Sequence, residues 1–121
     1  MRRKEIATAF LEAAASGDVR RAYERHVHPQ FRHHNAHFKG DPESLLTAIE
    51  ENARQFPDKT YEVLRALEEG DLVAVHGRVT LSADSQWSVI HICRFDGDRI
   101  AEMWEASQEV LADSPNENGL F

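Results

Sequence analysis

The sequence predicts an α+β fold in which three helices precede and cover a curved antiparallel sheet. Hydrophobic residues recur every three or four positions in the first third of the chain and every second position from Thr60 onward. The chain has 121 residues, of which 41% are hydrophobic, and this is enough to fill one core. We therefore expect a single domain over residues 1–121, with strands that follow one another through tight turns.

Three helices are predicted from apolar spacing and from their end signals. The first carries an apolar stripe over residues 6–14 and ends at Gly17, and the second covers residues 19–26. The third, over residues 42–56, begins with a capping oxygen, a proline and a carboxylate in Asp41-Pro42-Glu43. We expect this third helix to pack across the concave side of the sheet.

The strands follow the change to a period of two. A short strand is expected at residues 31–35, and a meander of four strands at residues 60–68, 72–81, 86–95 and 98–108. Residues 110–121 show no periodicity, so they are expected to form an extended or mobile tail.

The turns between the strands determine which side chains share a face. A three-residue loop with Gly97 in the left-handed conformation pairs Arg94 with Asp98, and a two-residue turn at Ala83-Asp84 sets His76 opposite His91. One face is then expected to carry Leu72, Ala74, His76, Trp87, Val89, His91, Cys93, Phe95, Ala101, Met103 and Glu105.

Three titratable residues on that apolar face, His76, His91 and Glu105, suggest the polar points of a ligand pocket. In this register four residues at ~3.3 Å each separate the levels of His91 and Glu105, so the two would bracket a ligand without touching. Desolvation should raise the pKa of Glu105 from ~4.3 toward 6 or higher. The alternatives are a solvated carboxylate at the strand end and, for His91, a core histidine bonded to a backbone carbonyl. Trp87 and Met103 are expected in the pocket wall or core.

Composition argues against several partners and sites. The net charge is −7, and basic residues are scattered, so neither nucleic acid nor an anionic membrane surface is an expected partner. Cys93 is the only cysteine, which excludes an intrachain disulfide and a cysteine-based zinc site. Glu5 and Glu12 interrupt the apolar N-terminal stretch, which favours an amphipathic helix of a cytoplasmic protein over a secretory signal.

Five histidines at positions 26, 28, 33, 34 and 37 raise the possibility of a metal site. His33 and His37 have the spacing of ligands on a helix, but their segment is predicted as strand and turn. No carboxylate lies among them before Asp41. We therefore expect no metal, and a metal-binding protein is only the third alternative for the function.

Four segments carry recognisable motifs. They are Phe31-Arg32-His33-His34-Asn35, Val75-His76-Gly77, His91-Ile92-Cys93-Arg94-Phe95 and the run from Gly97 to Glu105, which ends in Ile-Ala-Glu-Met-Trp-Glu. Together they resemble the SnoaL-like polyketide cyclases of the nuclear transport factor 2 superfamily. The resemblance implies a cone-shaped fold. It places Glu105 where related cyclases carry the aspartate that acts as acid and base in an aldol closure, and His91 where they carry a histidine. It also implies pocket hydrogen bonds from His34 and Asn35.

The resulting expectation is a lyase, cyclase or isomerase that acts on a small carbonyl compound without a cofactor. Glu105 would transfer the proton, and His91 or His76 would bind the enolate oxygen. The rival is a non-catalytic ligand-binding module of the same fold. Family members pair through the outer face of the sheet, and we expect a homodimer here through Val73, Val75, Ile90, Ile92 and Trp104.

Overall fold

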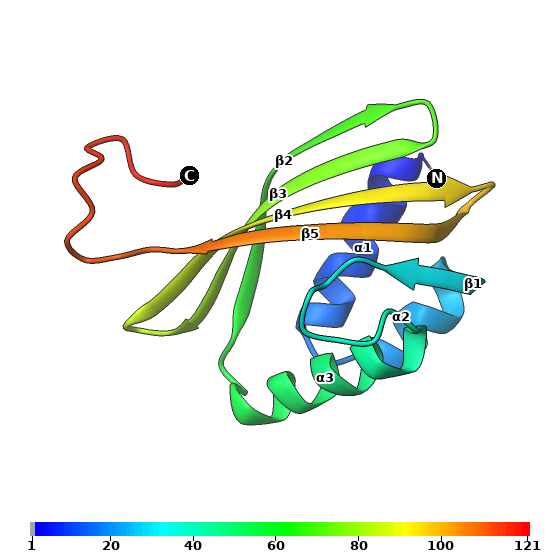
Figure 1. Ribbon diagram of the computed structural model, residues 1–121, viewed down its shortest axis with the longest axis horizontal. Helices are drawn as coiled ribbons and strands as arrows, with labels where there is room; N and C mark the ends of the chain where they lie inside the picture. Colours follow the sequence, from blue (N-terminus) through cyan, green and yellow to red (C-terminus); the bar gives the residue numbers. More distant parts are fainter. Residues whose placement is uncertain (1) are drawn as a thin grey trace.

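The computed structural model describes residues 2–121, which form three helices and five strands (Figure 1). In chain order these are α1 (Arg3–Ala15), α2 (Val19–His26), β1 (Val27–His33), α3 (Pro42–Gln55), β2 (Thr60–Glu69), β3 (Leu72–Ser82), β4 (Ser85–Asp96) and β5 (Arg99–Glu109). The predicted elements are all present, and their ends shift by at most a few residues.

The helix ends follow the predicted signals. Gly17 adopts a φ of 96° just beyond α1, a conformation that favours glycine. At the start of α3 the side chain of Asp41 accepts a hydrogen bond of 3.0 Å from the backbone N–H of Ser44. Neither α1 nor any other helix within residues 2–121 is long and apolar enough to cross a membrane.

The five strands form one curved sheet in the order β1-β5-β4-β3-β2. Strands β2 to β5 are antiparallel neighbours as predicted, whereas β1 pairs with β5 in parallel at one edge. Figure 1 shows the strands bending so that the sheet curls toward the helices, which confirms the α+β cone. The core lies between this concave face and the helices, with Phe10, Val19, Val73, Val75, Cys93 and Ile100 almost fully buried.

A bulge near the end of β3 overturns the predicted position of His76. Ser82 pairs with Ser85 across the expected two-residue turn. The register shifts by one residue between Ser82 and Thr80, so that Thr80 pairs with Gln86. A shift of one residue moves every side chain of a strand to the other face. Val75 therefore lies opposite His91, and His76 lies opposite Ile90 on the convex face.

A second bulge changes the relation of β4 to β5. Asp96 pairs with Arg99 around a tighter turn than predicted, although Gly97 has the expected positive φ of 63°. The register then shifts between Phe95 and Arg94. As a result His91 and Glu105 are directly opposed neighbours, and the predicted separation of four residues is wrong.

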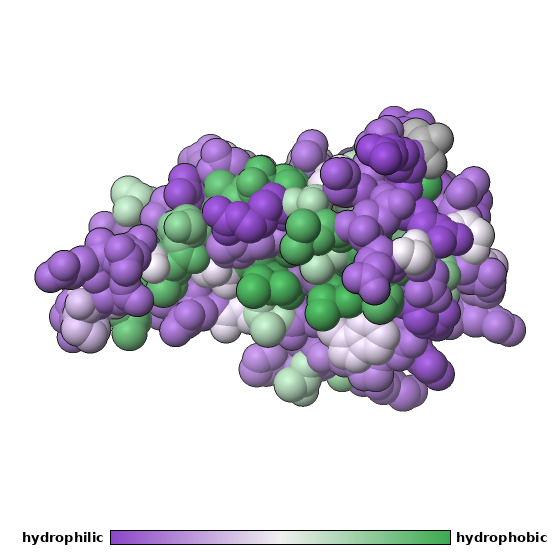
Figure 2. Space-filling view, turned by 90° about the horizontal axis from the view of Figure 1, so that it is seen from above, coloured by the Kyte–Doolittle hydropathy of each residue, from purple (hydrophilic) through white to green (hydrophobic). Residues whose placement is uncertain are grey.

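The convex face differs from the predicted dimer surface. Val73 and Val75 are buried in the core, so they cannot contribute to an outer patch. Ile90 and Ile92 do face outward, with exposed fractions of 45% and 39%. Figure 2 shows hydrophobic side chains gathered near the middle of the face viewed from above, with hydrophilic side chains around them.

The tail beyond β5 contains neither helix nor strand and turns back toward the sheet. The ring of Phe121 stacks on His76, and the guanidinium of Arg78 lies 4.2 Å from its centre. The tail is thus irregular, as predicted, but its last residue contacts the convex face.

Candidate functional site

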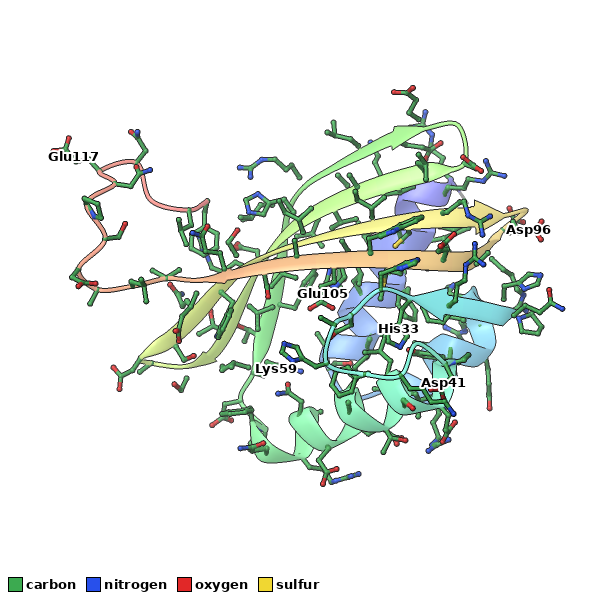
Figure 3. All side chains as sticks on the ribbon, in the orientation of Figure 1. His33, Asp41, Lys59, Asp96, Glu105 and Glu117 are labelled. Carbon is green, nitrogen blue, oxygen red and sulfur yellow. The ribbon has the colours of Figure 1, made fainter. Side chains whose placement is uncertain are left out.

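A cavity of about 340 Å³ lies between α1, α3 and the concave face of the sheet. Its size is at the lower end of the range for small-molecule pockets. Most of its wall is apolar, and the polar side chains are few: Asn35, Asn52, Lys59, Tyr61, His91, Glu105 and Ser107. Figure 3 shows Lys59 and Glu105 in the space between the sheet and the helices. A few polar groups in an apolar cavity are typical of a ligand site.

Three of the predicted residues meet at one end of this cavity. Glu105 Oε1 lies 3.4 Å from Nε2 of His91 on β4 and accepts a hydrogen bond of 3.4 Å from the Asn35 amide, in the loop after β1. The two contacts restrain one carboxylate oxygen with neighbours from two different elements. Both contacts are long for hydrogen bonds, which leaves the carboxylate incompletely paired.

The environment of Glu105 opposes the predicted change in its pKa. The contact with His91 lowers the pKa of Glu105 more than burial raises it, and Asn35 lowers it further. The expectation of a raised pKa is therefore wrong, because it assumed that His91 was distant. Glu105 is ionised at neutral pH, which suits a proton acceptor and not a proton donor.

His91 is itself nearly enclosed, and its two ring nitrogens have different surroundings. Nε2 faces the Glu105 carboxylate, whereas Nδ1 is buried and has no hydrogen-bond partner among residues 2–121. A carboxylate beside Nε2 favours a proton on that nitrogen. His91 thus supports Glu105 from the side, instead of facing it across a ligand as expected.

Trp87 and Met103 line the cavity as predicted, whereas two other predicted ligand-binding residues lie outside it. His76 on the convex face contacts Arg65 and Ser88. His34 stacks on Trp104 and bonds Glu102 at 2.7 Å on the same outer side. Their predicted placement in the pocket is wrong.

Two adjacent histidines lie at the end of β1, and His33 is the one that faces inward. It is only 5% exposed, and its Nδ1 accepts a hydrogen bond of 3.2 Å from the backbone N–H of Asn35. Its Nε2 has no partner among the described residues. His33 also lowers the pKa of Glu105, so it adds to the polar surroundings of the carboxylate.

Two further cavity residues were missed by the sequence analysis. Lys59 precedes β2, and its ammonium donates a hydrogen bond of 2.7 Å to Asn52 Oδ1 on α3. Tyr61 points from β2 over Gly77, and its buried hydroxyl has no partner within residues 2–121. Gly77 leaves the space for this ring, because a Cβ there would lie 2.7 Å from it. No local motif marks a lysine or tyrosine at the start of a strand as a site residue.

The histidine-rich segment does not come together as a metal site. Over residues 2–121 no group of three or more histidine, cysteine or acidic side chains has a geometry that could hold a metal ion. His28, for example, lies 3.4 Å from Asp96, whereas His34 contacts Glu102 and His33 contacts the backbone of Asn35. Cys93 is buried in the core, where burial raises its pKa to about 12.

Comparisons with known proteins agree with this architecture. The sequence profile of the SnoaL-like domain matches residues 7–103. Similar structures include AclR, a candidate hydroxylase from Streptomyces galilaeus, with 20% identity, a TM-score of 0.76 and 88% of both chains covered. IdmH, a candidate polyketide cyclase from Streptomyces antibioticus, has 23% identity and a TM-score of 0.73 over 89% of this chain and 93% of its own.

A third similar structure is a candidate SnoaL-like polyketide cyclase from Jannaschia, with 16% identity and a TM-score of 0.74 over 88% of this chain and 85% of its own. At these identities the structural likeness establishes the fold and not the reaction. No significant match was found among curated proteins.

Proposed function

We propose that this chain, which belongs to the SnoaL-like family, is an enzyme that moves a proton at a carbon next to a carbonyl group of a small molecule, without a cofactor. The observation that supports this proposal is the Glu105 carboxylate, held by His91 and Asn35 at the end of an apolar cavity. The reaction class is that of a cyclase, aldol-type lyase or isomerase.

Glu105 acts as the general base in this proposal. It is ionised, and its two contacts with His91 and Asn35 are both long, at 3.4 Å, and are both made by the same oxygen, Oε1. An ionised carboxylate in an apolar cavity can take a proton from a carbon whose conjugate base is an enolate. The electron pair of the broken C–H bond forms the C=C bond of the enolate, and the π pair of the carbonyl moves to its oxygen. The new carboxylic acid can return the proton at the same or another carbon.

Tyr61, which lines the same cavity, is the proposed donor for the enolate oxygen. Burial raises the pKa of its hydroxyl, so the hydroxyl keeps its proton, and the charge of Glu105 contributes to the same rise. The hydroxyl has no partner of its own in the described part of the chain. A hydrogen bond to an oxygen that gains charge would stabilise the enolate.

Deuterium exchange into an enolisable ketone tests the proposal. We suggest 2-tetralone in D₂O, followed by proton NMR, with wild-type protein, Glu105→Gln and the control Glu102→Gln. Glu105→Gln keeps the shape but removes the base, so catalysed exchange should fall by roughly 10²–10⁴-fold, while Glu102→Gln should keep most of it. Catalysed exchange that survives in Glu105→Gln would exclude Glu105 as the base.

A non-catalytic ligand-binding module is the second candidate. The lowered pKa of Glu105 favours it, because a weaker base abstracts a carbon-bound proton less readily. If wild-type protein binds 2-tetralone saturably but the protons of 2-tetralone exchange no faster than in buffer alone, the binding module is preferred. Exchange that depends on Glu105 supports the enzyme instead.

A further inference from the structure

The cavity contains a cation that no acidic side chain neutralises. Lys59 Nζ donates a hydrogen bond of 2.7 Å to the neutral amide of Asn52, and it forms no salt bridge with any residue in the described range 2–121. The other basic groups with close carboxylates, such as Arg20 and Arg78, lie at the surface. An ammonium that is half-buried without an anion is costly.

Burial acts on this ammonium as expected. Desolvation lowers the pKa of Lys59, and no charged side chain contributes to the change. A primary ammonium has three donors, and only one of them has a partner here. An anion at Nζ would restore the lost solvation and use the remaining donors.

Lys59 and Glu105 lie at different ends of the cavity. Strand β3 serves as the common reference for their positions. Lys59 lies two residues before Tyr61, which pairs with Val79 of β3. Glu105 pairs with His91, which in turn pairs with Val75 of β3. Val79 and Val75 are four residues apart, which is about 13 Å along a strand. The wall between the two ends is largely apolar, with Trp87 and Val89 among its residues.

We propose that Lys59 binds a carboxylate of the substrate, so that the natural substrate is an elongated carbonyl compound with an acid group at the end remote from its reacting carbon. This inference rests on the proposed function, because it takes the Glu105 end as the reacting end. The carboxylate would meet Nζ at the Lys59 end of the cavity, and the apolar middle of the molecule would lie along the sheet. Asn52 holds the ammonium in position for this contact.

A pair of probes of nearly the same size and shape, one an anion and the other a neutral amide, tests the inference by calorimetry. They are 4-phenylbutanoate and 4-phenylbutanamide, measured with wild-type protein, Lys59→Met, Lys59→Arg and the control Lys39→Met, which removes an exposed lysine that does not line the cavity. The acid should bind wild-type protein at least about tenfold more tightly than the amide, because charge-assisted hydrogen bonds are the stronger ones. Lys59→Met should remove this preference, whereas Lys59→Arg and Lys39→Met should keep it.

Several outcomes would overturn the inference. These are equal affinity of wild-type protein for both probes, an unchanged preference in Lys59→Met, or no binding of the acid at millimolar concentration. Loss of thermal stability in Lys59→Met with an unchanged preference would show that Lys59 only supports the end of α3. The Glu105→Gln variant separates the two proposals. It should lose catalysed proton exchange and still bind the acid more tightly than the amide. If wild-type protein catalyses proton exchange but does not prefer the acid over the amide, Glu105 remains the proposed base and only the role of Lys59 is removed.

Discussion

Two carboxylates three residues apart on β5 occupy opposite faces of the sheet and have contrasting surroundings. Glu102, on the convex face, has a side chain only 7% exposed and bonds His34 at 2.7 Å, Arg32 at 3.0 Å and Arg94 at 3.1 Å. Glu105, on the concave face, has a side chain 27% exposed with contacts no shorter than 3.4 Å.

The difference separates a structural carboxylate from one that is available for chemistry. The hydrogen bond from His34, followed by that from Arg32, lowers the pKa of Glu102 to about 2, and its oxygens have no capacity left for a ligand. Glu105 also has a lowered pKa, but its surroundings are a cavity wall and two long contacts. Both carboxylates are at least partly buried and both are ionised, so these two properties do not distinguish them; the incomplete pairing of Glu105 is the difference on which its proposed role rests.

The largest expected effect on stability is that of Glu102→Gln. The change removes the negative charge on β5 that pairs with cations on β1, on the loop after β1 and on β4. Because these cations are partly exposed, the loss should be roughly 2–3 kcal/mol of unfolding free energy. Glu105→Gln should cost less than about 1 kcal/mol, because its contacts are long. Urea denaturation at neutral pH measures both. Equal losses in the two variants would contradict the distinction between the faces.

The contribution of Glu102 should also depend on pH in a defined direction. Its folded pKa, about 2, is below the ordinary value of 4.5, so the unfolded chain binds the proton more readily. The stabilisation is fully present above pH 4.5 and disappears as the pH falls toward 2. The difference between wild type and Glu102→Gln should therefore shrink across this range in acid titrations followed by circular dichroism. A constant difference would show that shape and not charge causes the loss.

The strand order within the meander and the helix signals could be predicted from the sequence, because they depend on periodicity and on caps such as Asp41. The registers could not, because each depends on a bulge that adds one residue without changing the local pattern. The bulge between Thr80 and Ser82 moved His76 outside, and the bulge after Arg94 brought His91 to Glu105. The wrong pKa direction for Glu105 follows from that second error.

Residues of the site that lie outside strong patterns were also beyond prediction. Alternation fixes that adjacent His33 and His34 face opposite sides, but the parallel pairing of β1 with β5 decides which one is inside. Lys59 reaches the cavity from a turn, and its neighbour Asn52 is on a different element. Such contacts depend on tertiary packing and leave no periodic signal.

A smaller effect is expected from Gly77→Ala on the concave face. An added Cβ would lie 2.7 Å from Tyr61 Cζ and its hydroxyl oxygen, so the ring must shift, at a cost of about 1–2 kcal/mol. The same substitution in a Tyr61→Ala background should cost much less, because the obstacle is gone. A double-mutant cycle by chemical denaturation measures this coupling. Additive losses would show that the ring adjusts without strain.

The smallest expected effect on folding concerns the convex face, where we still predict a homodimer. Ile90 and Ile92 are exposed there, and apolar side chains on an outer sheet face commonly mark an interface. Ile92→Lys places a charge among them without touching the core, so monomer stability should change by no more than about 0.5 kcal/mol. Two such lysines would face the partner's apolar surface, and the dimer should dissociate as measured by sedimentation at micromolar concentration. Leu111→Lys, an equally drastic change at an exposed tail residue, should leave the dimer intact. A wild-type protein that sediments as a monomer would refute the dimer, and loss of the dimer in both variants would place the contact elsewhere than on β4.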